Sequence, residues 1–77
     1  MARIKNSQIQ GQLDRLNGLT VGHCYRVANL FIDVCGTDGR VHRTLYKASS
    51  RKDLYYTLSN MADCLHHQKH YSENKGN

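Results

Sequence analysis

The sequence predicts a small α+β fold in the order helix, two-stranded antiparallel hairpin and long C-terminal helix (α-β-β-α), associated as a dimer. Three observations lead to this prediction. Residues 50–67 carry apolar side chains at helical spacing, residues 24–48 are rich in β-branched and aromatic residues around an Asp-Gly turn, and the chain has 77 residues. A domain of that size is marginally stable alone, so self-association is a reasonable source of further buried surface.

We expect one domain over residues 1–70, followed by a disordered polar tail over residues 71–77. The three cysteines stand at irregular spacing, which favours reduced thiols and a cytoplasmic protein. No apolar run follows Arg3 and Lys5, so we expect no signal peptide. No stretch has the length of a membrane span, so we expect no membrane partner.

The first predicted element is a short helix over residues 8–17. Residues 7–10 read Ser-Gln-Ile-Gln and so have the form Ser-x-x-Gln, which is typical of a capping box at a helix start. Gly18 follows the helix, and its ease in adopting a left-handed conformation predicts the helix end there. The apolar face of this helix consists of Ile9, Leu13 and Leu16.

The next predicted element is one strand over residues 24–34, because its β-branched and aromatic residues no longer follow a helical repeat. Strict alternation gives it two apolar faces. One face carries Ala28, Leu30, Ile32 and Val34, and the other carries Tyr25, Val27 and Phe31. A two-stranded sheet with one helical layer covers a single face, so another chain, another strand or a ligand must cover the second. Another chain is the basis of the predicted homodimer.

Asp38-Gly39 supplies the positive φ that a tight hairpin turn requires, and residues 41–48 form the returning strand. The long helix then begins at Ser50, where Asp53 places a carboxylate near the positive end of the helix dipole. Its apolar stripe comprises Leu54, Leu58, Met61 and Leu65.

Basic residues concentrate in residues 40–52, within a chain of formal net charge +5. Such a field favours an anionic partner, although an ordinary solvated face is the alternative. Free N–H groups at the start of the long helix would converge there with hydroxyls and cations on an anion, and tyrosines could stack on a ring. The predicted anion- or partner-binding residues are Arg40, Arg43, Lys47, Ser50, Arg51, Lys52, Tyr55 and Tyr56.

The sequence gives little support for a metal site or for catalysis. Cys64 with His67, and His66 with His70, have spacings that could place a ligand pair on one helix face. No Cys-x-x-Cys or His-Glu-x-x-His motif accompanies them, and no carboxylate pair is positioned for general acid-base chemistry. We therefore predict no metal, no cofactor and no enzymatic activity.

Two segments carry a resemblance to a known group of proteins. Residues 12–17 read Gln-Leu-Asp-Arg-Leu-Asn, and residues 52–61 have the form Lys-x-Leu-Tyr-x-x-Leu-x-x-Met. With the tyrosine-containing hairpin between them, they resemble small uncharacterised phage and prophage proteins. The resemblance implies an accessory protein that acts inside a bacterial host and often binds and disables a host component.

We therefore predict a non-enzymatic, phage-type accessory protein that binds and neutralises a host component, either a defence protein or a phosphate-bearing signal. The alternative is a nucleic-acid-binding regulator that uses the basic residues 40–52. Salt dependence separates the two functions, because binding to nucleic acid releases counterions and weakens steeply as salt rises.

Overall fold

The computed structural model describes residues 3–75, and the side chains of residues 3–68. The elements are α1 (Asn6–Asn17), β1 (His23–Ala28), β2 (Phe31–Gly36), β3 (Val41–Lys47) and α2 (Arg51–Lys75). The predicted α+β class and the order helix, sheet, helix are confirmed. The sheet has three strands rather than the two predicted.

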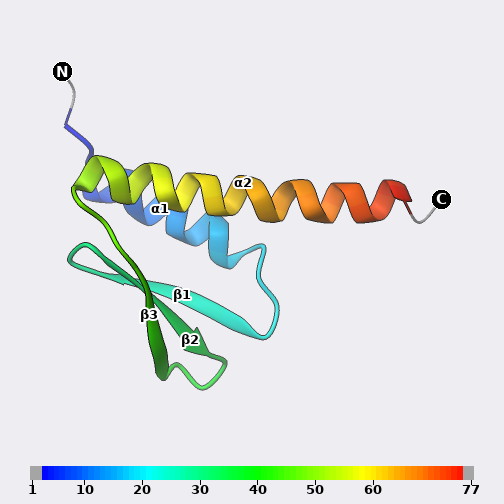
Figure 1. The fold of residues 1–77 in the computed structure, drawn as a ribbon, viewed down its shortest axis with the longest axis horizontal. Coiled ribbons are helices and arrows are strands. Elements are labelled where there is room, and N and C mark those ends of the chain that lie inside the picture. Colours follow the sequence, from blue (N-terminus) through cyan, green and yellow to red (C-terminus); the bar gives the residue numbers. More distant parts are fainter. Residues whose placement is uncertain (1–2, 76–77) are drawn as a thin grey trace.

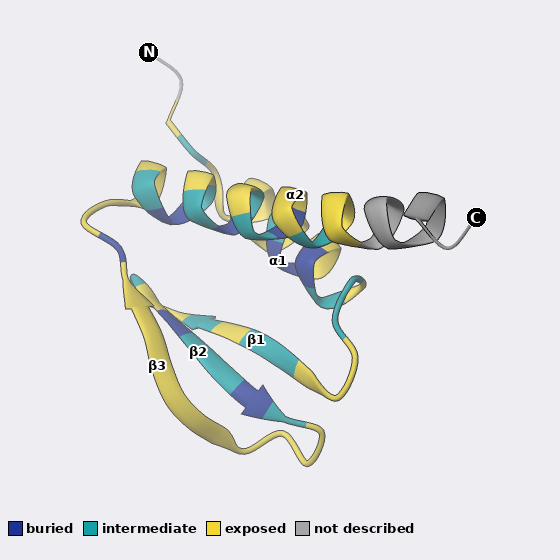
Figure 2. Ribbon diagram, turned by 45° about the vertical axis from the view of Figure 1, so that its right-hand side comes forward, coloured by how far each residue is buried: buried dark blue, intermediate teal, exposed yellow. Residues whose placement is uncertain are grey.

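The two helices lie side by side in one layer, and the sheet extends below them (Figure 1). The strands are antiparallel in the order β1-β2-β3, so β2 is central and β1 and β3 are edges. Figure 2 shows that burial is concentrated where the helices face the sheet, whereas β3 is exposed along its whole length. The core cluster consists of Ile9, Leu13, Leu16, Ile32, Ala48, Leu54, Leu58 and Ala62.

β1 and β2 replace the single strand predicted over residues 24–34. A two-residue turn joins them, and its first residue, Asn29, has a φ of 55° in the left-handed region that Asn tolerates better than most residues. The reversal pairs Val27 with Ile32, so both point to the inner face, toward the helices. Phe31 points to the outer face. Placing Val27 and Phe31 on one face was wrong, because alternation does not continue through a reversal.

This reversal removes the observation on which the homodimer prediction was based, namely one strand with two apolar faces. The two apolar faces of one long strand become largely one inner face of two strands, and the helices of the same chain cover it. Dimerisation itself stays a prediction.

α1 begins two residues before the predicted start and ends differently. The side chain of Gln8, not Gln10, satisfies the first turn, because its Oε1 accepts a hydrogen bond from the Lys5 backbone N–H at 2.8 Å. Gly18 has a φ of −70°, so the predicted left-handed helix end is wrong.

α2 confirms the predicted apolar stripe, because Leu54 and Leu58 are buried while Met61 and Leu65 pack against the core cluster. Its backbone continues to Lys75, past the predicted end at residue 67 and into the segment expected to be a tail. The predicted β2–β3 turn is confirmed, with Gly39 at a φ of 82°. Within residues 3–75, neither helix is long and apolar enough to cross a membrane.

Candidate binding surface

The eight residues predicted to bind an anion or a partner lie in separate places. Arg40 is in the β2–β3 turn, and Arg43 and Lys47 are on β3. The remaining five lie at or near the start of α2: Ser50, Arg51, Lys52, Tyr55 and Tyr56. The structure does not gather them into one basic face, and two local features explain why.

The first feature is a pair of β-bulges in β3. The register with β2 shifts twice, so that β3 carries one extra residue at each shift. Arg43 pairs with Val34, and Lys47 pairs with Phe31. Since Val34 and Phe31 are three residues apart on β2, their side chains point to opposite faces. Arg43 and Lys47 therefore do not share a face, although simple alternation along an unbulged strand would place two residues four apart on the same face.

The second feature is the internal cap of α2. The Ser50 hydroxyl accepts a hydrogen bond from the Asp53 backbone N–H at 3.1 Å. The Asp53 carboxylate in turn accepts from the Ser49 backbone N–H at 2.9 Å. The chain's own carboxylate thus occupies the place where we expected an external anion, as in a capping box.

These contacts alter the acidity of both partners at the cap. The Ser49 backbone N–H and then the Tyr46 hydroxyl donate to Asp53 and hold the pKa of that carboxyl below its usual value. The same hydrogen bond to Asp53 raises the pKa of the Tyr46 phenol. The ionised carboxylate is therefore part of the local structure.

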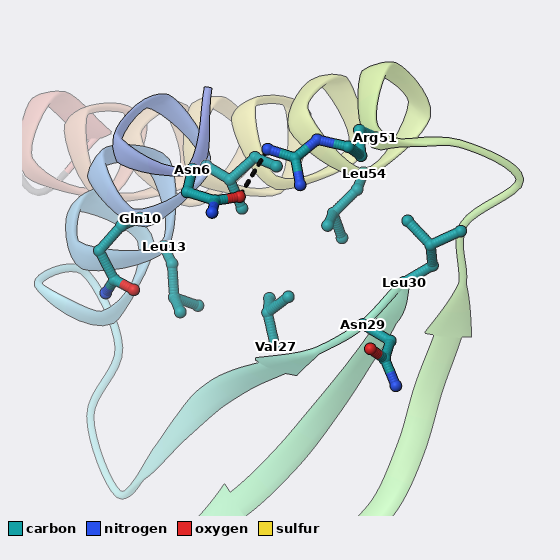
Figure 3. A pocket seen from close by; sticks show the side chains of 9 residues that line it. Asn6, Gln10, Leu13, Val27, Asn29, Leu30, Arg51 and Leu54 are labelled. Carbon is teal, nitrogen blue, oxygen red and sulfur yellow. Dashed lines mark hydrogen bonds between the residues drawn. The ribbon is translucent and has the colours of Figure 1, made fainter. Parts of the chain in front are cut away.

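Arg51 is also engaged within the chain. Its guanidinium donates to the Ile4 carbonyl at 3.0 Å and to Asn6 Oδ1 at 2.5 Å. The bond to Asn6 ties the start of α2 to the first residue of α1 (Figure 3), and the bond to Ile4 ties it to the segment before α1. Arg51 therefore has a structural task that its sequence position did not indicate.

A hollow of about 690 Å³ lies beside Arg51, between α1, the β1–β2 turn and the first turn of α2 (Figure 3). Leu13, Val27 and Leu54 line its apolar part, and Gln10 contributes an amide at the rim. An apolar wall with a few amides could hold a small organic molecule. Its lining offers no carboxylate, histidine or cysteine for catalysis.

The strongest concentration of exposed apolar and basic side chains lies on and beside β3. All seven β3 residues are exposed. Phe31, Val41 and Leu45 leave 38%, 45% and 39% of their surface accessible. The Lys47 ammonium lies 5.5 Å from the centroid of the Phe31 ring, a cation–π distance. We call this region the β3 surface and define it by Phe31, Arg40, Val41, Arg43, Leu45 and Lys47.

Among the described side chains, the two tyrosines and the histidines and cysteine with ligand-like spacing form no second site. The Tyr55 and Tyr56 rings contact each other edge to face, 5.4 Å apart, and Tyr55 packs against the core. Among the residues that the structure describes, no group of three histidine, cysteine or acidic side chains could hold a metal. The side chain of His70 lies outside the described part, so the predicted absence of metal stays a prediction.

No family model, curated protein or solved structure matches this chain. The resemblance to phage proteins therefore stays an expectation. Sequence reasoning missed Phe31, Val41 and Leu45 as surface residues. Asn29 could have signalled the β1–β2 turn, because Asn is favoured where φ is positive.

Proposed function

We propose that this protein is a non-enzymatic binding protein whose β3 surface holds an acidic, extended segment of a partner protein. The observation that carries the proposal is the exposure of a complete edge strand that combines apolar and basic side chains. An extended peptide can lie along such an edge, with apolar contacts providing affinity and cations selecting acidic residues.

The two edges of the sheet differ in a way that favours β3. On the β1 edge, the Asn17 side chain bonds both backbone groups of Tyr25, donating to its carbonyl at 2.9 Å and accepting from its N–H at 2.7 Å. The Thr20 hydroxyl donates to the His23 carbonyl at 2.8 Å. β1 is therefore already partly covered by its own chain. Within the described residues, β3 pairs only with β2.

Charge argues for an acidic partner rather than for a second β3. Self-pairing of two β3 strands would place the positive charges of one copy, Arg43 on one face and Lys47 on the other, along the same edge as those of its partner, and like charges on neighbouring strands oppose pairing. The predicted homodimer thus requires another surface. Light scattering at micromolar concentration tests it: a dimer has twice the 8.8 kDa chain mass, and a monomer contradicts it.

A protein partner is favoured over nucleic acid because the basic residues do not form one continuous face. Arg43 and Lys47 point to opposite faces, and Arg51 is bonded to the segment before α1. In keeping with the resemblance to phage proteins, the proposed partner is a component of a bacterial host that binding would neutralise.

Photo-crosslinking in a nuclease-treated bacterial lysate tests the proposal. A photoreactive phenylalanine analogue replaces Leu45 on β3, and a matched variant carries it at Asn60, an exposed position on α2. We expect a protein adduct from the Leu45 position only, with the crosslink mapped to an acidic segment. A synthetic peptide of that segment should then bind the purified protein.

Three results would contradict the proposal. They are a crosslink mapped to a neutral or basic segment, equal labelling from both positions, or an adduct that forms in untreated lysate but not in the nuclease-treated one. The double variant Arg43→Glu/Lys47→Glu serves as the charge control. It should abolish the Leu45 adduct while the circular dichroism spectrum stays that of the parent.

A further inference from the structure

Two cysteines face each other on the outer face of the sheet. Cys24 on β1 is the register partner of Cys35 on β2. Residues that are directly opposite in an antiparallel pair project to the same face. Neither the binding proposal nor the fold uses these two thiols.

The hydrogen-bond pattern of β1 fixes the kind of pair that they form. Both backbone groups of Tyr25 point outward to Asn17, so Tyr25 and Val34 are a pair without mutual hydrogen bonds. Because the two kinds of pair alternate, Cys24 and Cys35 form a hydrogen-bonded pair, whose Cα atoms are about 5.5 Å apart. That separation is within the range of about 4.4–6.8 Å found in disulfides.

The surroundings of the two thiols are unequal. Cys35 is 2% exposed, yet it stands apart from the core cluster between the helices and the sheet. Cys24 is half-buried and open to solvent on the outer face. Burial and the neighbouring Cys24 raise the pKa of the Cys35 thiol. A small oxidant would therefore meet Cys24 first, with Cys35 poised behind it.

We infer that Cys24 and Cys35 form a reversible intramolecular disulfide and that their substrate class is a small disulfide such as oxidised glutathione. The Cys24 thiolate attacks one sulfur of the oxidant, forms a mixed disulfide and releases one thiolate. The Cys35 thiolate then attacks the Cys24 sulfur and releases the second thiolate. Two protein thiols lose two electrons and two protons, and the oxidant becomes two thiols.

The third cysteine provides an internal reference. Cys64 is exposed on α2 and lines a hollow with Tyr25, whose side chain packs on the inner face of the sheet. The sheet thus separates Cys64 from the pair on the outer face. Cys64 should therefore stay outside the intramolecular disulfide, either as a thiol or as a mixed disulfide with glutathione.

The test exposes the folded protein to oxidised glutathione, alkylates the remaining thiols and measures intact mass and tryptic peptides without reduction. We expect Cys24 and Cys35 to become protected from alkylation together, and the Cys64→Ser variant to lose about 2 Da before alkylation without bound glutathione. Trypsin cleaves after Arg26, so the disulfide should join residues 16–26 to residues 27–40. Dithiothreitol should restore all three thiols.

The matched variants separate the pair from general thiol reactivity. Cys64→Ser should keep the disulfide, whereas Cys35→Ser should trap glutathione on Cys24. If Cys35→Ser does not fold, Cys24→Ser tests the pair instead and should leave the buried Cys35 alkylatable after unfolding. When the protein is oxidised in urea, we expect a mixture of disulfides in which Cys64 also takes part. Three alkylatable thiols after oxidation, a stable glutathione adduct on Cys24 of the parent, or the same mixture of linkages with and without urea would overturn the inference.

Discussion

The Tyr46 hydroxyl donates a hydrogen bond to the Asp53 carboxylate at 2.8 Å and so joins β3 to the first turn of α2. The same carboxylate accepts from Ser49 and completes the cap of α2. The Asp53 carboxylate therefore holds the end of β3 against the first turn of α2 and also caps that helix.

This arrangement predicts a loss of stability in acid. The pKa of Asp53 is lowered in the folded protein, so its stabilising effect is present above the unfolded pKa of about 3.9 and is lost as pH falls through the lower folded pKa. Asp53→Asn should flatten the decline of the urea midpoint between about pH 5 and pH 2. Tyr46→Phe should flatten it in part, because Ser49 still donates. A parent-like acid decline in Asp53→Asn would contradict this role.

The core of α2 predicts a large effect at Leu58. This side chain is fully buried in the core cluster, so Leu58→Ala should lower the free energy of unfolding by about 2–5 kcal/mol. Asn60→Ala, at an exposed position on the same helix, should change it by no more than about 0.5 kcal/mol. Urea unfolding followed by circular dichroism measures both. Similar values for the two variants would show that the assigned helix face is wrong.

The elements that could be predicted from the sequence are those with strong local periodicity or a specific turn requirement. The stripe through Leu54 and Leu58 repeats over several helical turns, so one face is determined without tertiary information. The Asp38-Gly39 turn has a specific backbone requirement and was predicted for the same reason. The turn at Asn29 lacks glycine and interrupts a continuous apolar run, so alternation was carried through it.

The candidate site was harder to predict because it depends on register. A bulge moves every later side chain to the other face, and no local residue pattern at Arg43 or Lys47 announces the two shifts in β3. The contacts of Arg51 with Ile4 and Asn6 span more than forty residues, which pattern reasoning does not reach.

The hydrogen bonds of the Asn17 side chain predict a loss of stability on substitution that helix propensity alone does not predict. Asn17→Ala removes two hydrogen bonds to the backbone of Tyr25 and should lower the free energy of unfolding by about 1–3 kcal/mol. Asn17→Asp keeps the acceptor for the Tyr25 N–H and should cost less. Gln10→Ala, on the exposed side of the same helix, is the matched control and should change stability by no more than about 0.5 kcal/mol. An Asn17→Ala value as small as the control would contradict the proposed tether.

The last prediction distinguishes the basic residues of the β3 surface, whose loss should change the association rate, from Arg51, whose loss should change stability. Arg43→Glu and Lys47→Glu alter exposed side chains of the β3 surface, so they should slow association with the mapped acidic peptide and leave stability within about 0.5 kcal/mol. Arg51→Ala removes hydrogen bonds to Ile4 and Asn6 and should lower the free energy of unfolding by about 0.5–1.5 kcal/mol. Its association rate should stay that of the parent.

Interferometry with the immobilised peptide measures the association rates, and urea titration measures the stabilities. Lys52→Ala is the control, because it removes a neighbouring exposed cation at the start of α2. If Arg51→Ala slows association as much as Arg43→Glu, the partner also contacts the start of α2, and the binding surface is wider than the β3 surface. If instead neither β3 variant slows association, the cations of β3 do not select the partner. The apolar contacts of Phe31, Val41 and Leu45 would then have to account for binding without them.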